Sequence, residues 1–199
     1  VVDAETLAAA HTRAVTDRSY VWFVSYREYR NSSRSLWPAT RTERVVVENA
    51  TSYRSEAGGW GSLAGTPYVV ADVDAYADGQ YRYVRDTRNE TTTYERIPVY
   101  GRTLSGGERG TALAYAERAG RYVRWFLSAE ATRVHDVVTI DNRTYYRVTA
   151  FGSDYPEAEN FSAVALVAPN GFVTEMRITY DVVDSNRVAE IQLSYWDRN

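Results

Sequence analysis

The two histidines, His11 and His135, are the side chains in this sequence best suited to metal binding or acid–base chemistry. A zinc site needs three or four converging ligands, and two histidines supply at most half of that set. The sequence contains no cysteine, which excludes thiolate metal sites, disulfides and cysteine nucleophiles. We therefore expect both histidines to be solvated, and the sequence predicts neither a metal nor a cofactor.

Other catalytic or ligand-binding motifs are equally weak. The stretch DVDAYADG at 72–79 lacks the spacing of a calcium loop, Asp-X-Asp-X-Asp-Gly. Ser105-Gly106-Gly107 precedes a helical pattern, but no Gly-Lys-Ser/Thr follows it, so it indicates a helix-entry loop rather than a phosphate site. Neither Gly-X-Ser-X-Gly nor His-Glu-X-X-His occurs. The sequence favours a protein that is not an enzyme.

Five Asn-X-Ser/Thr sequons are the clearest sign of cellular location. Such sites matter only in exported proteins, so they favour export and predict exposed acceptor side chains. The candidate glycosylation sites are Asn31, Asn49, Asn89, Asn142 and Asn160.

Charge and hydropathy exclude two classes of partner. All 23 basic residues are arginine, against 26 acidic residues, and the net charge of −3 is dispersed. Without a basic stripe we expect no nucleic-acid partner. No apolar run approaches the roughly 18 residues of a membrane-spanning helix. The chain begins at Val1, so we expect a signal segment to have preceded it.

Hydrophobic periodicity predicts two helices among many strands. Good helix formers follow the candidate cap Asp3, and Leu113, Ala116, Gly120, Val123 and Leu127 recur at helical spacing. Tyr, Val, Trp and Phe dominate the strand patterns, which end at turn-forming pairs such as Asp78-Gly79 and Asp141-Asn142. The predicted helices are 3–17 and 111–128, and the predicted strands are 19–31, 41–55, 67–76, 80–86, 91–97, 131–140, 143–151, 161–168, 172–183 and 187–196.

This order predicts an α+β fold, with one domain spanning 1–199. We expect a single, strongly curved antiparallel sheet of about nine to eleven strands, because sheets of that size rarely stay flat. The N-terminal helix and the central helix would cover part of the concave face. Whatever they leave uncovered would form an apolar groove, a half-barrel with an open mouth.

Strand 19–31 and the central helix are expected to line that groove. Alternation places Trp22 on a face too apolar for water, and the helix is shorter than the strand it covers. Trp60 is a candidate lid, because the surrounding glycines predict a loop. The candidate lining residues are Trp22, Val45, Val47, Leu113, Tyr122, Val123 and Phe126.

Three stretches carry a resemblance to known proteins: DAETLAAAHTRAVTDRSYVW, VDAYADGQYRYVRDT and TRVHDVVTIDNRTYYRVTAF. The order of elements resembles the half-barrel lipoprotein-carrier superfamily, which includes the LolA and LolB carriers and the mycobacterial LppX and LprG lipoproteins. More narrowly, the first stretch resembles uncharacterised surface lipoproteins of haloarchaea. The resemblance implies a halophilic archaeal source and a lipid anchor, attached outside the given chain, on the extracellular face of the cell membrane. The lipobox cysteine of such proteins is missing, and the acidic excess, 26 against 23, is small.

Two functions from different classes remain open on the sequence. The first is an exported binding module that shelters a lipid or another hydrophobic small molecule in the groove. The alternative is a non-enzymatic surface or assembly glycoprotein with a filled core, whose exposed sheet edges pair with a surface protein partner. A large solvent-connected cavity would favour the first function, and a solid interior would favour the second.

Overall fold

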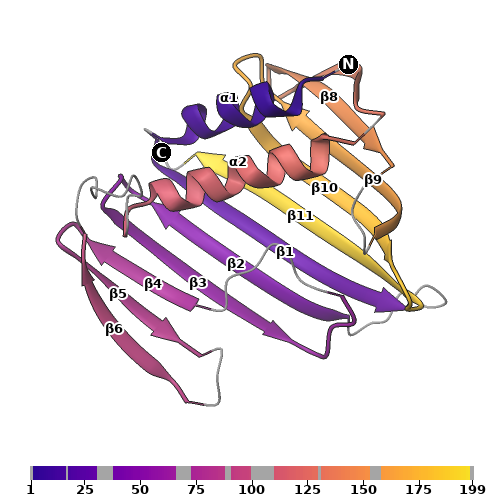
Figure 1. The fold of residues 1–199 in the computed structure, drawn as a ribbon. Coiled ribbons are helices and arrows are strands. Elements are labelled where there is room, and N and C mark those ends of the chain that lie inside the picture. The colour runs from indigo at the N-terminus through magenta and orange to yellow at the C-terminus, as the bar shows by residue number, and fades with distance from the viewer. Residues whose placement is uncertain are drawn as a thin grey trace.

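A computed structural model describes residues 2–16, 18–30, 38–65, 73–87, 91–99, 110–129, 131–152 and 158–197. These residues form one antiparallel sheet of eleven strands in the order β6-β5-β4-β3-β2-β1-β11-β10-β9-β8-β7. Its terminal strands, β6 and β7, do not pair with each other, so the sheet is open (Figure 1). The α+β class, the antiparallel sheet and the two helices are confirmed.

The elements follow each other as a helix, six strands, a second helix and five strands. Their bounds are α1 Ala4–Thr16, β1 Tyr20–Arg30, β2 Ala39–Val47, β3 Ser52–Trp60, β4 Val73–Asp78, β5 Tyr81–Asp86, β6 Thr93–Pro98, α2 Leu113–Leu127, β7 Arg133–Ile140, β8 Arg143–Phe151, β9 Ala158–Val167, β10 Val173–Val182 and β11 Arg187–Asp197.

Strand β1 lies at the centre of the sheet, between β2 and β11. Its inward side chains Tyr20, Trp22, Val24 and Tyr26 are all buried, as a strand under a helical layer requires. The other face of β1 is the outer face of the sheet, where Phe23 packs on Trp196 with ring centroids 6.4 Å apart. Phe23 is therefore partly covered by a neighbour in the sheet, on the face of β1 that points away from the helices.

Both helices lie on the inward face, where they cross the middle of the sheet side by side (Figure 1). They approach closely because α2 has a glycine at the contact: a Cβ atom on Gly120 would stand 2.1 Å from the Thr12 hydroxyl oxygen of α1. On the sheet side, Trp22 packs against Tyr122 with ring centroids 6.0 Å apart. In the described part of the chain, neither helix is long and apolar enough to cross a membrane.

Two sequence predictions need correction, and a third lies only partly within the described residues. Segment 41–55 is two strands, β2 and β3, joined by a turn in which the Asn49 side chain accepts backbone hydrogen bonds from Thr51 and Ser52. The predicted glycine-rich break instead continues β3 to Trp60, because Thr40 and Arg41 of β2 pair with Trp60 and Gly59. Of the predicted strand 67–76, only the part from Val73 lies in the described residues.

The turns follow the sequence signals closely. Asp141 and Asn142 both have positive φ, 49° and 62°, as a two-residue hairpin turn requires. Gly79 and Gly171 also have positive φ, 99° and 82°. At Gly171 a side chain would also meet α1, since a Cβ atom there would lie 2.5 Å from that of Ala10. These turns fix the register of the hairpins that build each half of the sheet.

A buried carboxylate fastens the segment after β3 to the sheet. Glu28 is 1% exposed, and it accepts hydrogen bonds from the Tyr26 hydroxyl at 2.7 Å and from the backbone N–H groups of Ala64 and Gly65 at 2.6 and 2.8 Å. Arg187 of β11 adds an ion pair at 3.1 Å. Such complete hydrogen bonding is what allows a charge to be buried.

Candidate functional site

Three hollows on the described surface lie in different places. One of about 550 Å³ is on the outer face of β3–β6, and one of about 960 Å³ lies along the turns beside Phe172 and Trp196. The third, of about 470 Å³, lies between α2 and the inward face of β3–β6. We call it the α2 groove and take it as the candidate site, because it alone among these hollows has a helix for one wall.

The sheet wall of the α2 groove consists of rows of inward side chains that run across the strands. One row holds Tyr53, Ala77, Arg82 and Ile97, and the next holds Ser55, Ala75, Val84 and Glu95. The lining residues are Glu43, Tyr53, Ser55, Val73, Arg82, Val84, Asp86, Thr93, Glu95, Ile97, Gly110, Thr111, Ala114, Tyr115, Arg118 and Arg121. A volume within the range of 300–1,000 Å³ suits a small ligand.

A buried ion pair forms the inner wall of the α2 groove. The Glu43 carboxylate of β2, 1% exposed, pairs with the Arg118 guanidinium of α2 and accepts a hydrogen bond from the Ser55 hydroxyl at 3.3 Å. Burial raises the pKa of Glu43, although Arg118 and Ser55 act against that shift. Arg118 also lies over the rings of Trp22 and Tyr115, 5.0 and 5.2 Å from their centroids. This pair ties the helix to the sheet.

The predicted lining residues lie together, but beside the α2 groove rather than around it. Six of them are buried in one core cluster, and Leu113 is partly buried against it. Trp22, Val45 and Val47 belong to β1 and β2, and Tyr122, Val123 and Phe126 belong to α2. None of the seven lines the groove. Their direct contact with a ligand stays a prediction.

The candidate lid and the sequons also have defined positions. Trp60 is 45% exposed at the end of β3, and its role as a lid stays a prediction. Asn49, Asn142 and Asn160 are exposed, although the Asn160 amide donates a hydrogen bond to Asp181 at 2.6 Å. Asn31 and Asn89 lie outside the described residues. Glycosylation stays a prediction at all five.

The two histidines have opposite environments, and the expectation of two solvated rings is wrong for His11. His135 is exposed, whereas His11 is 1% exposed. Its Nδ1 accepts a hydrogen bond from the Val173 N–H at 3.1 Å, and its Nε2 lies 3.2 Å from the Tyr195 hydroxyl. Burial lowers the pKa of His11 to about 3. In the described residues no group of three or more His, Asp or Glu is placed to hold a metal.

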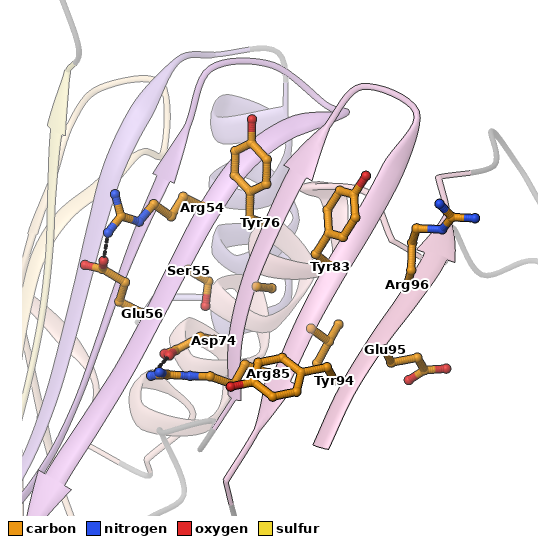
Figure 2. Close-up of a pocket in the computed structure, with 12 residues that line it drawn as sticks. Arg54, Ser55, Glu56, Asp74, Tyr76, Tyr83, Arg85, Tyr94, Glu95 and Arg96 are labelled. Carbon is orange, nitrogen blue, oxygen red and sulfur yellow. Dashed lines mark hydrogen bonds and ion pairs between the residues drawn. The ribbon is translucent and has the colours of Figure 1, made fainter. Parts of the chain in front are cut away.

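The outer hollow has a different chemistry from the α2 groove. Figure 2 shows Tyr76 and Tyr83 side by side on β4 and β5, with ring centroids 6.2 Å apart. Arginines flank them, and two of these form ion pairs on the same face: Arg54 with Glu56, and Arg85 with Asp74. These charges face solvent and neutralise each other, so the hollow is an exposed surface rather than an enclosed site.

Sequence reasoning missed the polar half of the α2 groove. Glu43 shares its side of β2 with Val45 and Val47, so alternation alone places it inward. Ala114, Arg118 and Arg121 recur at helical spacing along one flank of α2. An inward carboxylate on a strand and an arginine stripe on the covering helix were the available signals.

Comparisons with known proteins give similarity among solved structures only. No protein-family model and no curated protein matches the chain. It is similar to a LolA superfamily protein from Nitrosomonas europaea, with 11% identity, a TM-score of 0.31 and coverage of 100% of this chain and 95% of that chain. It is also similar to LprF from Mycobacterium bovis, with 13% identity, a TM-score of 0.41 and coverage of 96% of this chain and 91% of that chain. A third similar structure is LppX from Mycobacterium tuberculosis, with 10% identity, a TM-score of 0.36 and coverage of 97% of this chain and 93% of that chain. The architecture described above rests on the sheet register of this chain itself.

Proposed function

We propose that this protein is a non-enzymatic binding module that shelters the apolar part of a lipid or another hydrophobic small molecule in the α2 groove. The observation that carries the proposal is the cavity of about 470 Å³ between α2 and β3–β6. Tyr53, Val84, Ile97 and Tyr115 supply its apolar surface, while the pair of Glu43 and Arg118 fixes the helix above it.

The buried residues beside the α2 groove support this function indirectly. Trp22 and Val45 pack under α2 in the same core cluster as Val123 of the helix, and this packing holds the helix at a fixed height over the sheet. The groove then needs no rearrangement to exist, and a preformed site loses less free energy on binding. In the same proposal, the protein is exported and attached to the extracellular face of the membrane by a lipid anchor.

Filling the α2 groove tests this proposal. Ala114 is an exposed residue of α2 that lines the cavity, so Ala114→Trp places an indole in the space without overpacking the core. We expect the wild-type protein to bind a fluorescent fatty-acid analogue and to carry a co-purified lipid in native mass spectrometry, and Ala114→Trp to do neither while keeping its thermal unfolding midpoint.

Glu117→Trp is the matched control, since Glu117 is exposed on the same helix and does not line the cavity. This variant should bind the analogue as the wild type does. Equal binding by folded Ala114→Trp would remove the α2 groove as the site. Failure of the wild-type protein to bind any apolar probe would refute the function.

A structural or assembly role is the second candidate, and the filled core under the helices favours it. The terminal strands β6 and β7 each pair with one neighbour in the described sheet, which leaves one side of each for another strand. Sedimentation analysis across a wide concentration range distinguishes the candidates. Concentration-dependent chains of molecules in the absence of lipid binding would support assembly, whereas a monomer that binds the probe would refute it.

A further inference from the structure

The α2 groove is electrically uneven along its length. Arg82 lies in the row nearest the start of α2, where Gly110 and Thr111 also line the cavity. Asp86 lies four residues further along the same strand, which is about 13 Å at strand spacing. Glu95 stands between them on β6, opposite Val84. Arg82 therefore makes the end at the start of α2 positive, whereas further along the groove the lining carries both carboxylates and Arg121.

The two arginines nearest the buried wall of the α2 groove differ in their partners. The Nε atoms of Arg82 and Arg118 are inaccessible to solvent, so only the terminal nitrogens of these side chains can meet a ligand in the cavity. Arg118 is paired with Glu43, whereas Arg82 lines the cavity and forms no ion pair with a described residue. A ligand that brings an anionic oxygen to the terminal nitrogens of Arg82 would supply that partner.

The start of α2 adds to the positive potential at this end. Its N-cap residue, Ala112, makes no side-chain capping hydrogen bond, and the first turn contains no acidic residue. The N–H groups of Ala112, Ala114 and Tyr115 donate to backbone carbonyls, so the helix acts on this end through its dipole rather than through free donors. Thr111 and Ala114, on either side of the first helical residue, both line the cavity. The helix terminus and the arginines therefore act on the same end of the groove.

Glu43 does not cancel this potential at Arg82. Its carboxylate is held by Arg118 and by the Ser55 hydroxyl, two rows away from Arg82 in the sheet. The remaining lining carboxylates, Asp86 and Glu95, disfavour an anion at their own positions. Together they leave one orientation for an anionic amphiphile: the charged group beside Arg82, and the apolar chain along Val84 and Ile97.

We propose that the end of the α2 groove at Arg82 binds the carboxylate or phosphate group of an amphiphilic ligand. Arg82 is the principal contact, because it lines the cavity and forms no ion pair with a described residue. Arg118 adds positive charge to the wall while its terminal nitrogen holds Glu43. This inference rests on the proposed function and narrows its ligand class from hydrophobic molecules in general to anionic amphiphiles.

Ligands with the same alkyl chain but different head groups show how much the charged group contributes to binding, apart from the chain. Dodecanoate, dodecyl phosphate and 1-dodecanol are titrated into the wild-type protein at pH 8, with inorganic phosphate and acetate as the anions without a chain. We expect both anionic amphiphiles to bind at least tenfold more tightly than 1-dodecanol, since charge-assisted hydrogen bonds are the stronger ones. The chainless anions should show no measurable binding, because they gain nothing from the apolar wall.

Variants of Arg82 assign that preference to its guanidinium. Arg82→Met should lower dodecanoate affinity about tenfold and leave 1-dodecanol affinity within about twofold, as loss of one charged contact predicts. Arg82→Lys keeps the charge but loses the planar fork, so it should keep part of the preference. Arg85→Met is the control on the outer face of the same strand, where Arg85 pairs with Asp74, and should keep all of it. Thermal unfolding confirms that each variant is folded.

The possible results separate this inference from the proposed function. Equal affinity for dodecanoate and 1-dodecanol would overturn the anion site and leave the binding function standing. Failure of every dodecyl ligand would overturn both. Inorganic phosphate that binds as tightly as dodecyl phosphate would also overturn both, since the chain would then contribute nothing. An undiminished preference in folded Arg82→Met would overturn the assignment to Arg82.

Discussion

The inward face of the sheet has two halves that differ in chemistry. Under the helices, β8–β11 present Ala, Val, Ile and Met side chains, such as Ala163, Ala165, Ile178 and Ile191, which are at most 1% exposed. On β3–β6 the inward positions include Ser55, as well as arginine and carboxylate side chains. One continuous sheet thus carries a filled half and a half with a cavity.

The difference shows that the type of inward side chain decides which part of a curved sheet is covered by a close-packed layer. Small apolar residues on β8–β11 let the helices come down onto the sheet, and the contact between Gly120 and Thr12 brings the helices together. Charged inward residues on β5 and β6 need water or a polar partner, so a close-packed layer cannot form over them. The cavity therefore lies beyond the boundary at which the small apolar residues of the inward face give way to charged ones.

Breaking the buried ion pair at the boundary should have the largest effect. Glu43→Ala leaves the Arg118 guanidinium without its buried partner, and such losses cost about 3–5 kcal/mol of unfolding free energy. Glu56→Ala, which removes the exposed pair with Arg54 on the outer face, should cost less than about 1 kcal/mol. Urea denaturation measures both, and equal losses would contradict the assignment of the boundary.

A pair of valine truncations compares the two halves directly. Val45 and Val84 lie in the same row across the sheet, but Val45 is 0% exposed whereas Val84 lines the α2 groove. Val45→Ala should cost about 2–3 kcal/mol, from two methylene equivalents and the cavity left behind. Val84→Ala should cost less than about 1 kcal/mol. If Val84→Ala proved as destabilising as Val45→Ala, the groove would have to be packed in solution.

Acid should destabilise the filled half through His11. Burial lowers the pKa of His11 to about 3, whereas an unfolded histidine titrates near 6.5. Between these values the unfolded chain binds a proton that the folded chain does not, so stability falls as the pH drops. From pH 7 to pH 5.5 the loss should be about 1 kcal/mol.

Chemical denaturation at the two pH values measures this loss, and comparison with His11→Gln removes the contributions of all other groups. His135→Gln is the control, because His135 is exposed and should leave the dependence intact. Persistence of the full dependence in His11→Gln would disprove the role of His11.

Local features of the fold were predictable from the sequence. Asp141-Asn142 and Gly79 mark turns through their own backbone preferences, and α2 is visible in its apolar periodicity. The predicted strand bounds were wrong where strand pairing overrides local preference. Gly58 and Gly59 favour a break in the chain, yet they pair with β2 inside a strand.

The site was less predictable, because its position depends on strand order. Alternation shows that Val45 and Val84 each face one side of a sheet, but it does not show which strands α2 covers. That is set by the pairing of β1 with β11, a contact between the two ends of the chain. The predicted lining residues therefore fell in the filled half, while Arg82 and Glu43 were not among the predicted site residues.

The pairing of the first strand with the last also sets the order in which this chain can mature. Strands β1–β6 form one meander and β7–β11 another, each built from neighbours in sequence, so each can assemble locally and quickly. The seam between β1 and β11 cannot close until β11 has been synthesised and has left the ribosome. During synthesis β1 therefore exposes an unpaired edge, and chaperone binding should be longest at that strand.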